Sequence, residues 1–233
     1  MLKAFFPKET GDENRVALVP ANVKGWQDLK IQVCVESGLG GALGIDDREY
    51  AQAGAEIVEN NSRGAMLGAA DLVCQVGARP EEEVTLLKKG ALHIGFLDPF
   101  RRSDLLPLFR DQGVGLVSME MMPRTTIAQK MDALSSQANL AGYSAVLLAA
   151  QKLDRIFPMM MTPAGTLPPA RVFVVGVGVA GLQAIATAKR LGARVDAFDT
   201  RPVVEDQVKS LGAKFVKIDL GDTGEAAQGY AKE

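Results

Sequence analysis

Short apolar runs alternate with amphipathic stretches along the first half of the chain. The apolar runs that we predict to be strands are residues 2–7, 31–37, 71–77, 92–98 and 113–120. The segments between them that have helical spacing of apolar residues are 20–29, 46–53, 63–68, 81–87 and 103–109. Alternation of this kind predicts a mostly parallel sheet with helices on both faces.

The second half repeats the alternation after a break. An apolar strand at 171–178 runs into glycines, and the segments that follow it are helix 179–191, strand 193–199, helix 203–211 and strand 213–219. Three strands and two helices in this order make the first half of a dinucleotide-binding sheet. We therefore predict an α/β protein with two doubly wound Rossmann-like domains built on parallel sheets, of which the second is incomplete.

The segment between the two halves has its own pattern. Apolar spacing predicts a long helix over 128–157. Five of the fifteen residues at 158–172 are Pro or Gly, which marks a boundary, and two short extended pieces around Ala164–Gly165 suggest a hairpin. The predicted domains are an N-terminal α/β domain at 1–127, a connecting helix and hairpin at 128–170, and a nucleotide-binding domain at 171–233.

Composition narrows the class of protein. Apolar residues make up 47% of the chain and charged residues 23%, and the formal charge of −2 gives no argument for nucleic acid or an anionic membrane. No apolar run approaches the roughly 20 residues that a membrane span needs, so we expect a cytoplasmic protein. Cys34 and Cys74 lie inside apolar runs and are expected to be buried thiols. With a single histidine, the chain suggests no metal site.

A glycine motif, Gly176-Val177-Gly178-Val179-Ala180-Gly181, follows the strand at 171–178 and opens a helix. Gly176 permits a tight turn, Gly178 lets the backbone approach a pyrophosphate, and Gly181 allows close packing of helix and strand. The helix N-terminus then presents free N–H groups to phosphates. The motif predicts a site for a dinucleotide.

An acidic residue stands where the motif requires one. Asp199 ends the second strand, 18 residues after Gly181, where a carboxylate accepts hydrogen bonds from the ribose of NAD and repels the 2′-phosphate of NADP. Arg201 complicates this preference, because an arginine there can hold a 2′-phosphate. The alternative role for Asp199 is to cap the following segment, which starts at Pro202. Asp196 is a weaker candidate because it lies in mid-strand.

Several segments together resemble a known family. GVGVAGLQAIATAKRLGARVDAFDTRP, DQVKSLGAKF and GYAKE resemble the NAD(H)-binding component, the alpha subunit, of proton-translocating NAD(P) transhydrogenases. The stretch PKE…ENRVALVP at 7–20 is similar to the start shared by that family and alanine dehydrogenase. The resemblance covers residues 1–233, and family members continue well beyond this length, so the chain is expected to be a fragment.

The segment at 122–143 resembles a loop that distinguishes transhydrogenases. Its matching residues are Arg124, Gln129, Asp132 and Ser135. The resemblance implies that the loop reaches over the nicotinamide and that Gln129 meets the NADP(H)-binding partner. The family's arginine before the Ala-Gln pair is here Ile127. Spacing alone places Gln129, Asp132 and Ser135 on one helix face, or else makes Asp132 and Ser135 a capped, solvated helix start.

By the same resemblance, further residues are expected to surround the cofactor. Val179, Ala180 and Gly181 would contact the diphosphate, Asp199, Thr200 and Arg201 the adenosine ribose, and Gly229 and Tyr230 would belong to a loop that closes over the adenosine. The full set of expected cofactor-binding residues is Arg124, Thr125, Thr126, Gln129, Asp132, Ser135, Gly176, Gly178, Val179, Ala180, Gly181, Asp199, Thr200, Arg201, Gly229 and Tyr230. The residues expected to act in the reaction are Arg124, Gln129, Asp132 and Ser135.

The resemblance implies hydride transfer from NADH on this chain to NADP⁺ on a second component, coupled by membrane-spanning subunits to proton movement. It also implies a homodimer that associates with the membrane through these partners. The rival function is alanine dehydrogenase, for which Arg15 and His93 match but a required lysine is Gln75, a neutral amide that cannot pair with a carboxylate. A third possibility is a non-catalytic NAD-binding fragment.

Overall fold

The computed structural model describes residues 1–123 and 125–218. The chain divides into two compact units, Met1–Pro123 and Arg124–Glu233, and each is described by itself. The fold class predicted from the sequence is confirmed, because both units are built on parallel sheets with helices packed against them. The predicted domain limits at residues 127 and 170 stay predictions.

The first unit is a six-stranded parallel sheet in the order β3-β2-β1-β4-β5-β6. Its strands are β1 Leu2–Phe6, β2 Ile31–Glu36, β3 Glu56–Val58, β4 Leu72–Cys74, β5 Leu92–Gly95 and β6 Gly115–Ser118. The strand order reverses between β1 and β4, which creates a crevice at the carboxyl ends of these two strands. The sequence pattern missed β3, because this edge strand has three residues and only Val58 is buried.

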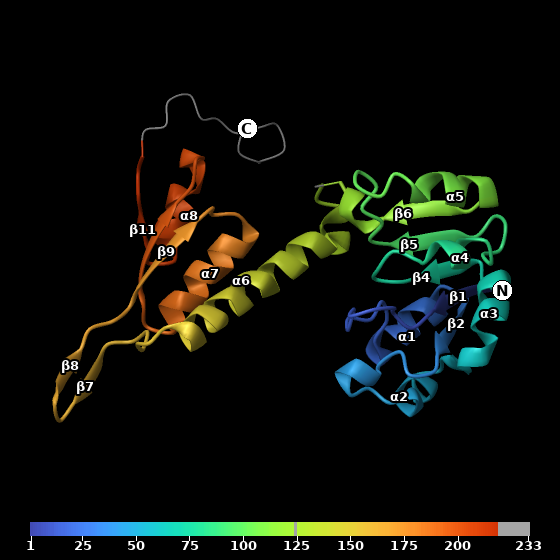
Figure 1. Ribbon diagram of the computed structural model, residues 1–233, viewed down its shortest axis with the longest axis horizontal. Helices are drawn as coiled ribbons and strands as arrows, with labels where there is room; N and C mark the ends of the chain where they lie inside the picture. Colours follow the sequence, from blue (N-terminus) through green and yellow to red (C-terminus); the bar gives the residue numbers. More distant parts are fainter. Residues whose placement is uncertain (124, 219–233) are drawn as a thin grey trace. The chain divides into compact units, whose positions relative to one another are not determined.

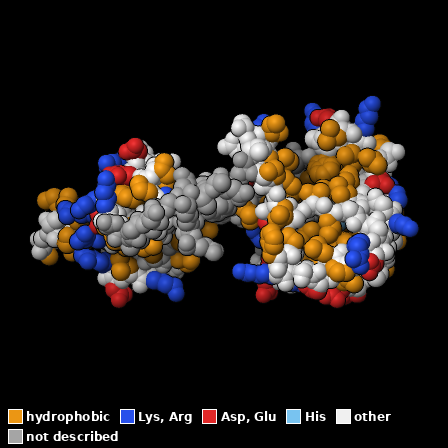
Figure 2. All heavy atoms as spheres, turned by 90° about the horizontal axis from the view of Figure 1, so that it is seen from above, with side chains coloured by type: hydrophobic (Ala, Val, Ile, Leu, Met, Phe, Trp, Pro, Cys, Tyr) orange, Lys and Arg blue, Asp and Glu red, His pale blue; other side chains and the backbone are white. Residues whose placement is uncertain are grey.

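Alternating side chains of β1 bury both faces of this sheet. Ala4 and Phe6 belong to one core cluster and Phe5 to another. The helices of the unit are α1 Pro20–Asp28, α2 Asp47–Gln52, α3 Arg63–Ala69, α4 Glu81–Val84 and α5 Leu105–Gln112. Helices α1 and α2 contribute Val23 and Tyr50 to the core of Phe6, while α3 and α5 contribute Leu67 and Phe109 to the core of Phe5. On the face in Figure 2, charged groups of both signs lie mostly around the edge of the unit.

The second unit holds a three-stranded parallel sheet in the order β11-β10-β9. Its elements are α6 Ala133–Lys152, β7 Met160–Thr162, β8 Gly165–Leu167, β9 Arg171–Val175, α7 Val179–Arg190, β10 Arg194–Phe198, α8 Glu205–Ser210 and β11 Lys214–Phe215. Helix α6 runs along α7 (Figure 1), and Val146 of α6 shares a core with Ile185 and Ala188 of α7. Strands β7 and β8 pair as the predicted antiparallel hairpin.

Short 3-10 turns complete the described secondary structure. They are η1 Gly41–Leu43, η2 Asn60–Ser62, η3 Met119–Met121, η4 Ala128–Met131 and η5 Pro202–Val204. None of the helices in the described residues is both long and apolar enough to cross a membrane.

The prediction of one helix over 128–157 is wrong at both ends. The chain forms the 3-10 turn η4, leaves helical geometry at Asp132 with ψ of 79°, and begins α6 only at Ala133. The Asp132 carboxylate accepts the N–H of Ser135, so a side-chain cap begins the helix. At the other end, α6 stops at Lys152 and the chain turns to bury Phe157 in the core of the second unit.

Tyr50 ties α2 to the segment before α1. Its ring is fully buried, and its hydroxyl donates a hydrogen bond of 2.8 Å to the Leu18 carbonyl oxygen. We expect Tyr50→Phe to lower the free energy of unfolding by about 1–2 kcal/mol, because it leaves a buried acceptor without its donor. Urea denaturation measures this loss, with Tyr143→Phe on the exposed side of α6 as the control. Equal stability of the two variants would contradict the assignment.

Candidate nucleotide-binding site

The glycine turn joins β9 to α7 and has the geometry that its sequence predicts. Gly176 has a φ of +88°, in the left-handed region that favours glycine. A Cβ on Gly181 would lie 1.9 Å from the Gly176 carbonyl oxygen, so the first turn of α7 packs directly on the turn. A Cβ on Gly178 would meet nothing within 4 Å, which leaves open space beside the helix N-terminus. This space is where a diphosphate would approach the backbone.

Asp199 holds the turn from the end of β10. One carboxylate oxygen accepts the Val177 N–H at 2.6 Å, and the other accepts the Arg201 N–H at 2.8 Å. The Arg201 guanidinium pairs with the same carboxylate, from Nε at 3.0 Å and Nη2 at 3.1 Å. The Asp199 side chain is therefore only 7% exposed. It fixes the glycine turn in place, a role that sequence reasoning did not foresee.

The charge of this carboxylate is set by opposing effects. Burial opposes ionisation, but the hydrogen bonds from Arg201 and from the Val177 N–H outweigh it and hold the pKa of Asp199 below its usual value. Asp199 is thus ionised near neutral pH. The Arg201 N–H that this carboxylate accepts belongs to the N-cap residue of η5, so Asp199 also holds the start of the following segment, while η5 has no cap bond from its own N-cap side chain. Asp196 pairs instead with Arg171 at 2.8 Å.

The start of α6 supplies a second group of expected residues. Asp132 is the N-cap, and its carboxylate accepts both the N–H of Ser135 at 2.9 Å and the hydroxyl of Ser135 at 2.6 Å. Gln129 lies in the separate turn η4. The expectation that Gln129, Asp132 and Ser135 share one helix face is therefore wrong. Gln129 lies in η4 and Ser135 in α6, and Asp132 caps α6 between these two separate helical segments.

The loop before this cap is exposed where the structure describes it. The side chains of Thr125, Thr126 and Gln129 are exposed, and Ile127 is 90% exposed. The Thr125 hydroxyl accepts the Ala128 N–H at 3.4 Å. Arg124, Gly229 and Tyr230, all expected in the site, lie outside the described residues.

A pocket of about 790 Å³ joins these pieces. The residues that line it come from the end of β9, the glycine turn and the first turn of α7 (175–182), from the end of β10 and the loop after it (198–201), from η5 and α8 (Val203, Val204 and Gln207), and from α6 (Leu134, Ser135 and Ala138). Of the loop residues expected from the sequence, Ser135 lies in this wall, while Thr125, Thr126, Gln129 and Asp132 do not line it. The volume is typical of a small-molecule site, and the donors at its floor suit a diphosphate.

The first unit holds the residues of the rival alanine dehydrogenase function. His93 is fully buried on β5 and stacks on Phe109, with ring centroids 5.3 Å apart. Burial lowers the pKa of His93 to about 3. Gln75 is buried and accepts the Arg79 guanidinium at 2.6 Å, whereas Arg15 is largely exposed and pairs with Glu13. His93 is a packed core residue in this structure and is not available to exchange protons with a substrate.

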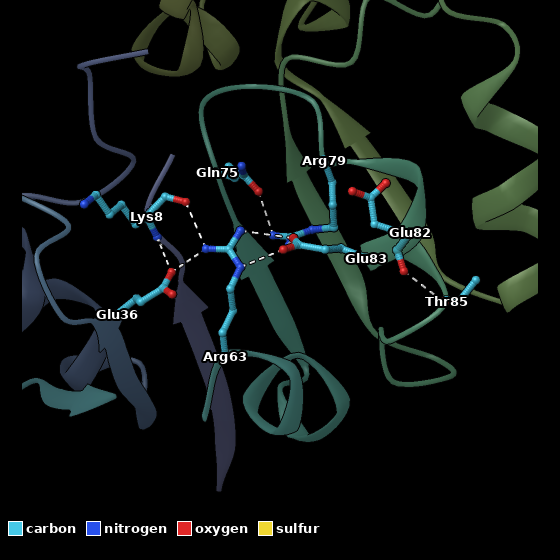
Figure 3. Close-up of polar contacts among 8 residues, drawn as sticks. All are labelled: Lys8, Glu36, Arg63, Gln75, Arg79, Glu82, Glu83 and Thr85. Carbon is cyan, nitrogen blue, oxygen red and sulfur yellow. Dashed lines mark hydrogen bonds and ion pairs between the residues drawn. The ribbon is translucent and has the colours of Figure 1, made fainter. Parts of the chain in front are cut away.

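Gln75 is attached to a network of ion pairs in the first unit (Figure 3), which was not predicted from the sequence. Arg63 lies between Glu36 and Glu83 and pairs with both, at 2.8 Å to Glu83. Arg79, which is 1% exposed, also pairs with Glu83. Arg79 and Glu83 are four residues apart, but Glu36 and Arg63 come from distant segments, and the set follows no recognisable motif. Each buried charge has an opposite partner, which buried charges require.

The crevice between β1 and β4 is occupied by the chain itself. The Glu9 carboxylate accepts the backbone N–H groups of Val76 at 2.7 Å and Gly77 at 3.0 Å. Amides in this position bind ligand anions in other doubly wound sheets. The first unit therefore does not offer these two donors to a nucleotide, and the second unit does offer an open glycine turn.

Comparison with known proteins agrees with this division. Residues 5–141 match the family described as alanine dehydrogenase/PNT, N-terminal domain, and residues 145–232 match its C-terminal domain. NAD(P) transhydrogenase subunit alpha of Cereibacter sphaeroides is 43% identical over 233 residues, covering 99% of this chain and 44% of the relative. Alanine dehydrogenase of Methanococcus maripaludis is 28% identical and covers 83% of this chain and 52% of that protein.

Solved structures give the same relationship. The crystal structure of transhydrogenase from Sinorhizobium meliloti has a TM-score of 0.88 and 46% identity, covering 92% of this chain and 64% of that one. The chain thus spans less than two thirds of the length of these relatives.

The parallel sheets and the glycine turn define a Rossmann-type nucleotide-binding protein. The two family matches together extend from residue 5 to residue 232. The chain belongs to the alanine dehydrogenase/PNT family.

The buried histidine predicts a pH dependence of stability. The pKa of His93 is about 3 in the folded chain and about 6.5 in the unfolded chain, so between these pH values the imidazole binds a proton only when the chain is unfolded. The stability that neutral His93 supports is complete above pH 6.5 and is lost as the pH falls toward 3. The slope of unfolding free energy against pH measures how many protons the chain takes up when it unfolds. Between pH 6.5 and 5, we expect this number to be lower by about one in His93→Leu than in the parent chain.

Urea denaturation from pH 7.5 to 5 measures this slope for both proteins. Ordinary carboxylates contribute mostly below about pH 5, so this window isolates the histidine. Parallel slopes for the parent chain and His93→Leu would show that the imidazole titrates normally in the fold.

Proposed function

We propose that this chain is the NAD(H)-binding component of a proton-translocating NAD(P)⁺ transhydrogenase. The observation that carries the proposal is the pocket in which the glycine turn, Asp199 and Ser135 meet. A glycine turn and a strand-end carboxylate are the two features by which such sheets hold NAD. The wall formed by α6 adds the segment in which this chain resembles transhydrogenases.

Two observations favour transhydrogenase over alanine dehydrogenase. The transhydrogenase subunit of Cereibacter sphaeroides is 43% identical to this chain, whereas the alanine dehydrogenase relative is 28% identical. Gln75 replaces the lysine expected for alanine oxidation, and its amide is already engaged by buried Arg79. The single histidine is buried and uncharged.

The proposal assigns roles along the pocket. The backbone of Val179, Ala180 and Gly181 would hold the diphosphate, and Asp199, Thr200 and Arg201 would surround the adenosine ribose. For a ribose hydroxyl to reach the Asp199 carboxylate, it must share or replace the hydrogen bonds of Arg201. Arg124, Gln129, Asp132 and Ser135 would face the nicotinamide, with Thr125 and Thr126 in the same loop. Gly229 and Tyr230 would close over the adenosine.

When bound, the nicotinamide supplies the hydride-transfer chemistry. This chain's residues contribute position and the exclusion of water, and they need no general base for that task. The proposed partners are an NADP(H)-binding component, membrane-spanning subunits and a second copy of this chain. The proposed location is the cytoplasmic side of the membrane, reached through those partners.

Asp199 allows a test of the ribose assignment. We expect Asp199→Ala to weaken NADH binding about tenfold to a hundredfold, the loss expected when a charged hydrogen-bond acceptor is removed, and to weaken NADPH binding much less. Isothermal titration gives both affinities. Asp199→Asn keeps an acceptor for the Val177 N–H, and so separates the loss of charge from the loss of the turn. Asp196→Asn, on β10 three residues before Asp199, is the control. Equal losses for the two cofactors would refute the assignment.

Gln129 allows a test of the partner-facing loop. In the full-length protein assembled with its NADP(H)-binding component, we expect Gln129→Ala to slow hydride transfer about tenfold while NADH affinity changes less than twofold, because the lost contact aligns the two rings without holding either one. Stopped-flow measurement of the transfer step, with Lys130→Ala as the exposed neighbour control, provides the readout. A transfer rate equal to that of the parent would remove Gln129 from the reaction.

A further inference from the structure

Helix α6 comes unusually close to the start of α7 at one residue. Gly142 is buried in α6, and a Cβ at this position would lie 2.1 Å from the Ala180 carbonyl oxygen and 3.0 Å from its Cα. Real Cβ atoms do not approach backbone this closely, so either the helix or its neighbour would have to move. Only glycine allows the two backbones to touch here.

The point of contact lies inside the nucleotide-binding turn. Ala180 is the second residue of α7, next to Gly181, whose own Cβ would lie 1.9 Å from the Gly176 carbonyl oxygen. The first turn of α7 is thus in backbone contact with the glycine turn on one side and with Gly142 on the other. A displacement of α6 at this point is transmitted to the N–H groups at the helix start.

The face of α6 that carries Gly142 also forms a wall of the pocket. Ser135, Ala138, Gly142 and Val146 follow one another at spacings of three, four and four residues, which places them on one face of the helix. Ser135 and Ala138 line the pocket, whereas Gly142 and Val146 are buried. The distance between Ser135 and the phosphate end of the pocket therefore depends on how closely α6 approaches at Gly142.

We infer that Gly142 is a positioning residue for the dinucleotide site. It acts through Ala180, by setting where the first turn of α7 lies relative to the glycine turn and to Ser135. This inference rests on the proposed function, since it concerns how the NAD(H) site is held in shape. The sequence motif gave no indication of it, because Gly142 lies 34 residues before Gly176.

The test is Gly142→Ala in this chain. Inside an exposed helix, replacing glycine by alanine is normally favourable, so a loss of function here points to the contact and not to helix propensity. We expect the Kd for NADH and for ADP to rise about tenfold, equivalent to about 1.4 kcal/mol, and the Kd for adenosine to change less than twofold. Adenosine lacks the diphosphate, so it reports only on the adenosine end of the site.

Two control variants separate positioning from general damage. Gly25→Ala makes the same change within α1, where a Cβ meets nothing within 4 Å, and is expected to leave every Kd unchanged. Val146→Ala removes buried atoms from the same face of α6, and is expected to lower Tm without changing the ratio of ADP to adenosine affinity. All affinities are measured in trimethylamine N-oxide, which favours the folded state of a destabilised variant.

The outcomes distinguish this inference from the proposed function. If the parent chain binds NADH and Gly142→Ala binds it equally well, the inference is wrong and the proposed function stands. If adenosine and ADP lose affinity equally, Gly142 acts only on stability, and the inference is again wrong. If the parent chain binds neither NADH nor ADP, the nucleotide-binding assignment itself fails and this inference fails with it.

Discussion

The first turn of α7 is fixed by contacts between backbones that no side chain separates. On one side Gly181 lies against the Gly176 carbonyl, and on the other Gly142 lies against the Ala180 carbonyl, each at a distance that excludes a Cβ. Such contacts leave little freedom to shift, because backbone atoms cannot change rotamer to relieve a clash. The position of the donors at this helix start is therefore set by three short-range contacts, from Gly176 just after β9, from α6 and from the loop after β10.

The third of these contacts is the Asp199 carboxylate. It accepts the Val177 N–H and the Arg201 guanidinium together, so one charged group links the glycine turn to the end of β10. This arrangement satisfies a nearly buried carboxylate before any ligand arrives. A nucleotide would then exchange hydrogen bonds with Arg201 instead of creating them on a bare charge, which reduces the desolvation cost of binding.

The fold was largely predictable from the sequence, because hydrophobic periodicity and glycine placement are local signals. The runs at 2–7 and 31–37 appear as central strands, and the glycines at 176–181 form the predicted turn. The misses have physical causes. Strand β3 is too short and too exposed to show a pattern. The break at Asp132 follows from one side-chain cap, in which both the N–H and the hydroxyl of Ser135 donate to the same carboxylate.

The candidate site was predictable only in part, for a related reason. The sequence motif includes Gly176, Gly178, Gly181 and Asp199, and the spacing of these residues predicts a dinucleotide site. Gly142 and the hydrogen bond from the Val177 N–H to Asp199 depend on contacts between residues far apart in the sequence, so no short window of sequence displays them. The same holds in the first unit, where Glu9 occupies the crevice between β1 and β4. It accepts the N–H of Val76, which lies 67 residues later in the sequence. The two parallel sheets of this chain therefore differ. The first offers its backbone donors Val76 and Gly77 to the carboxylate of Glu9, and the second leaves open space beside Gly178.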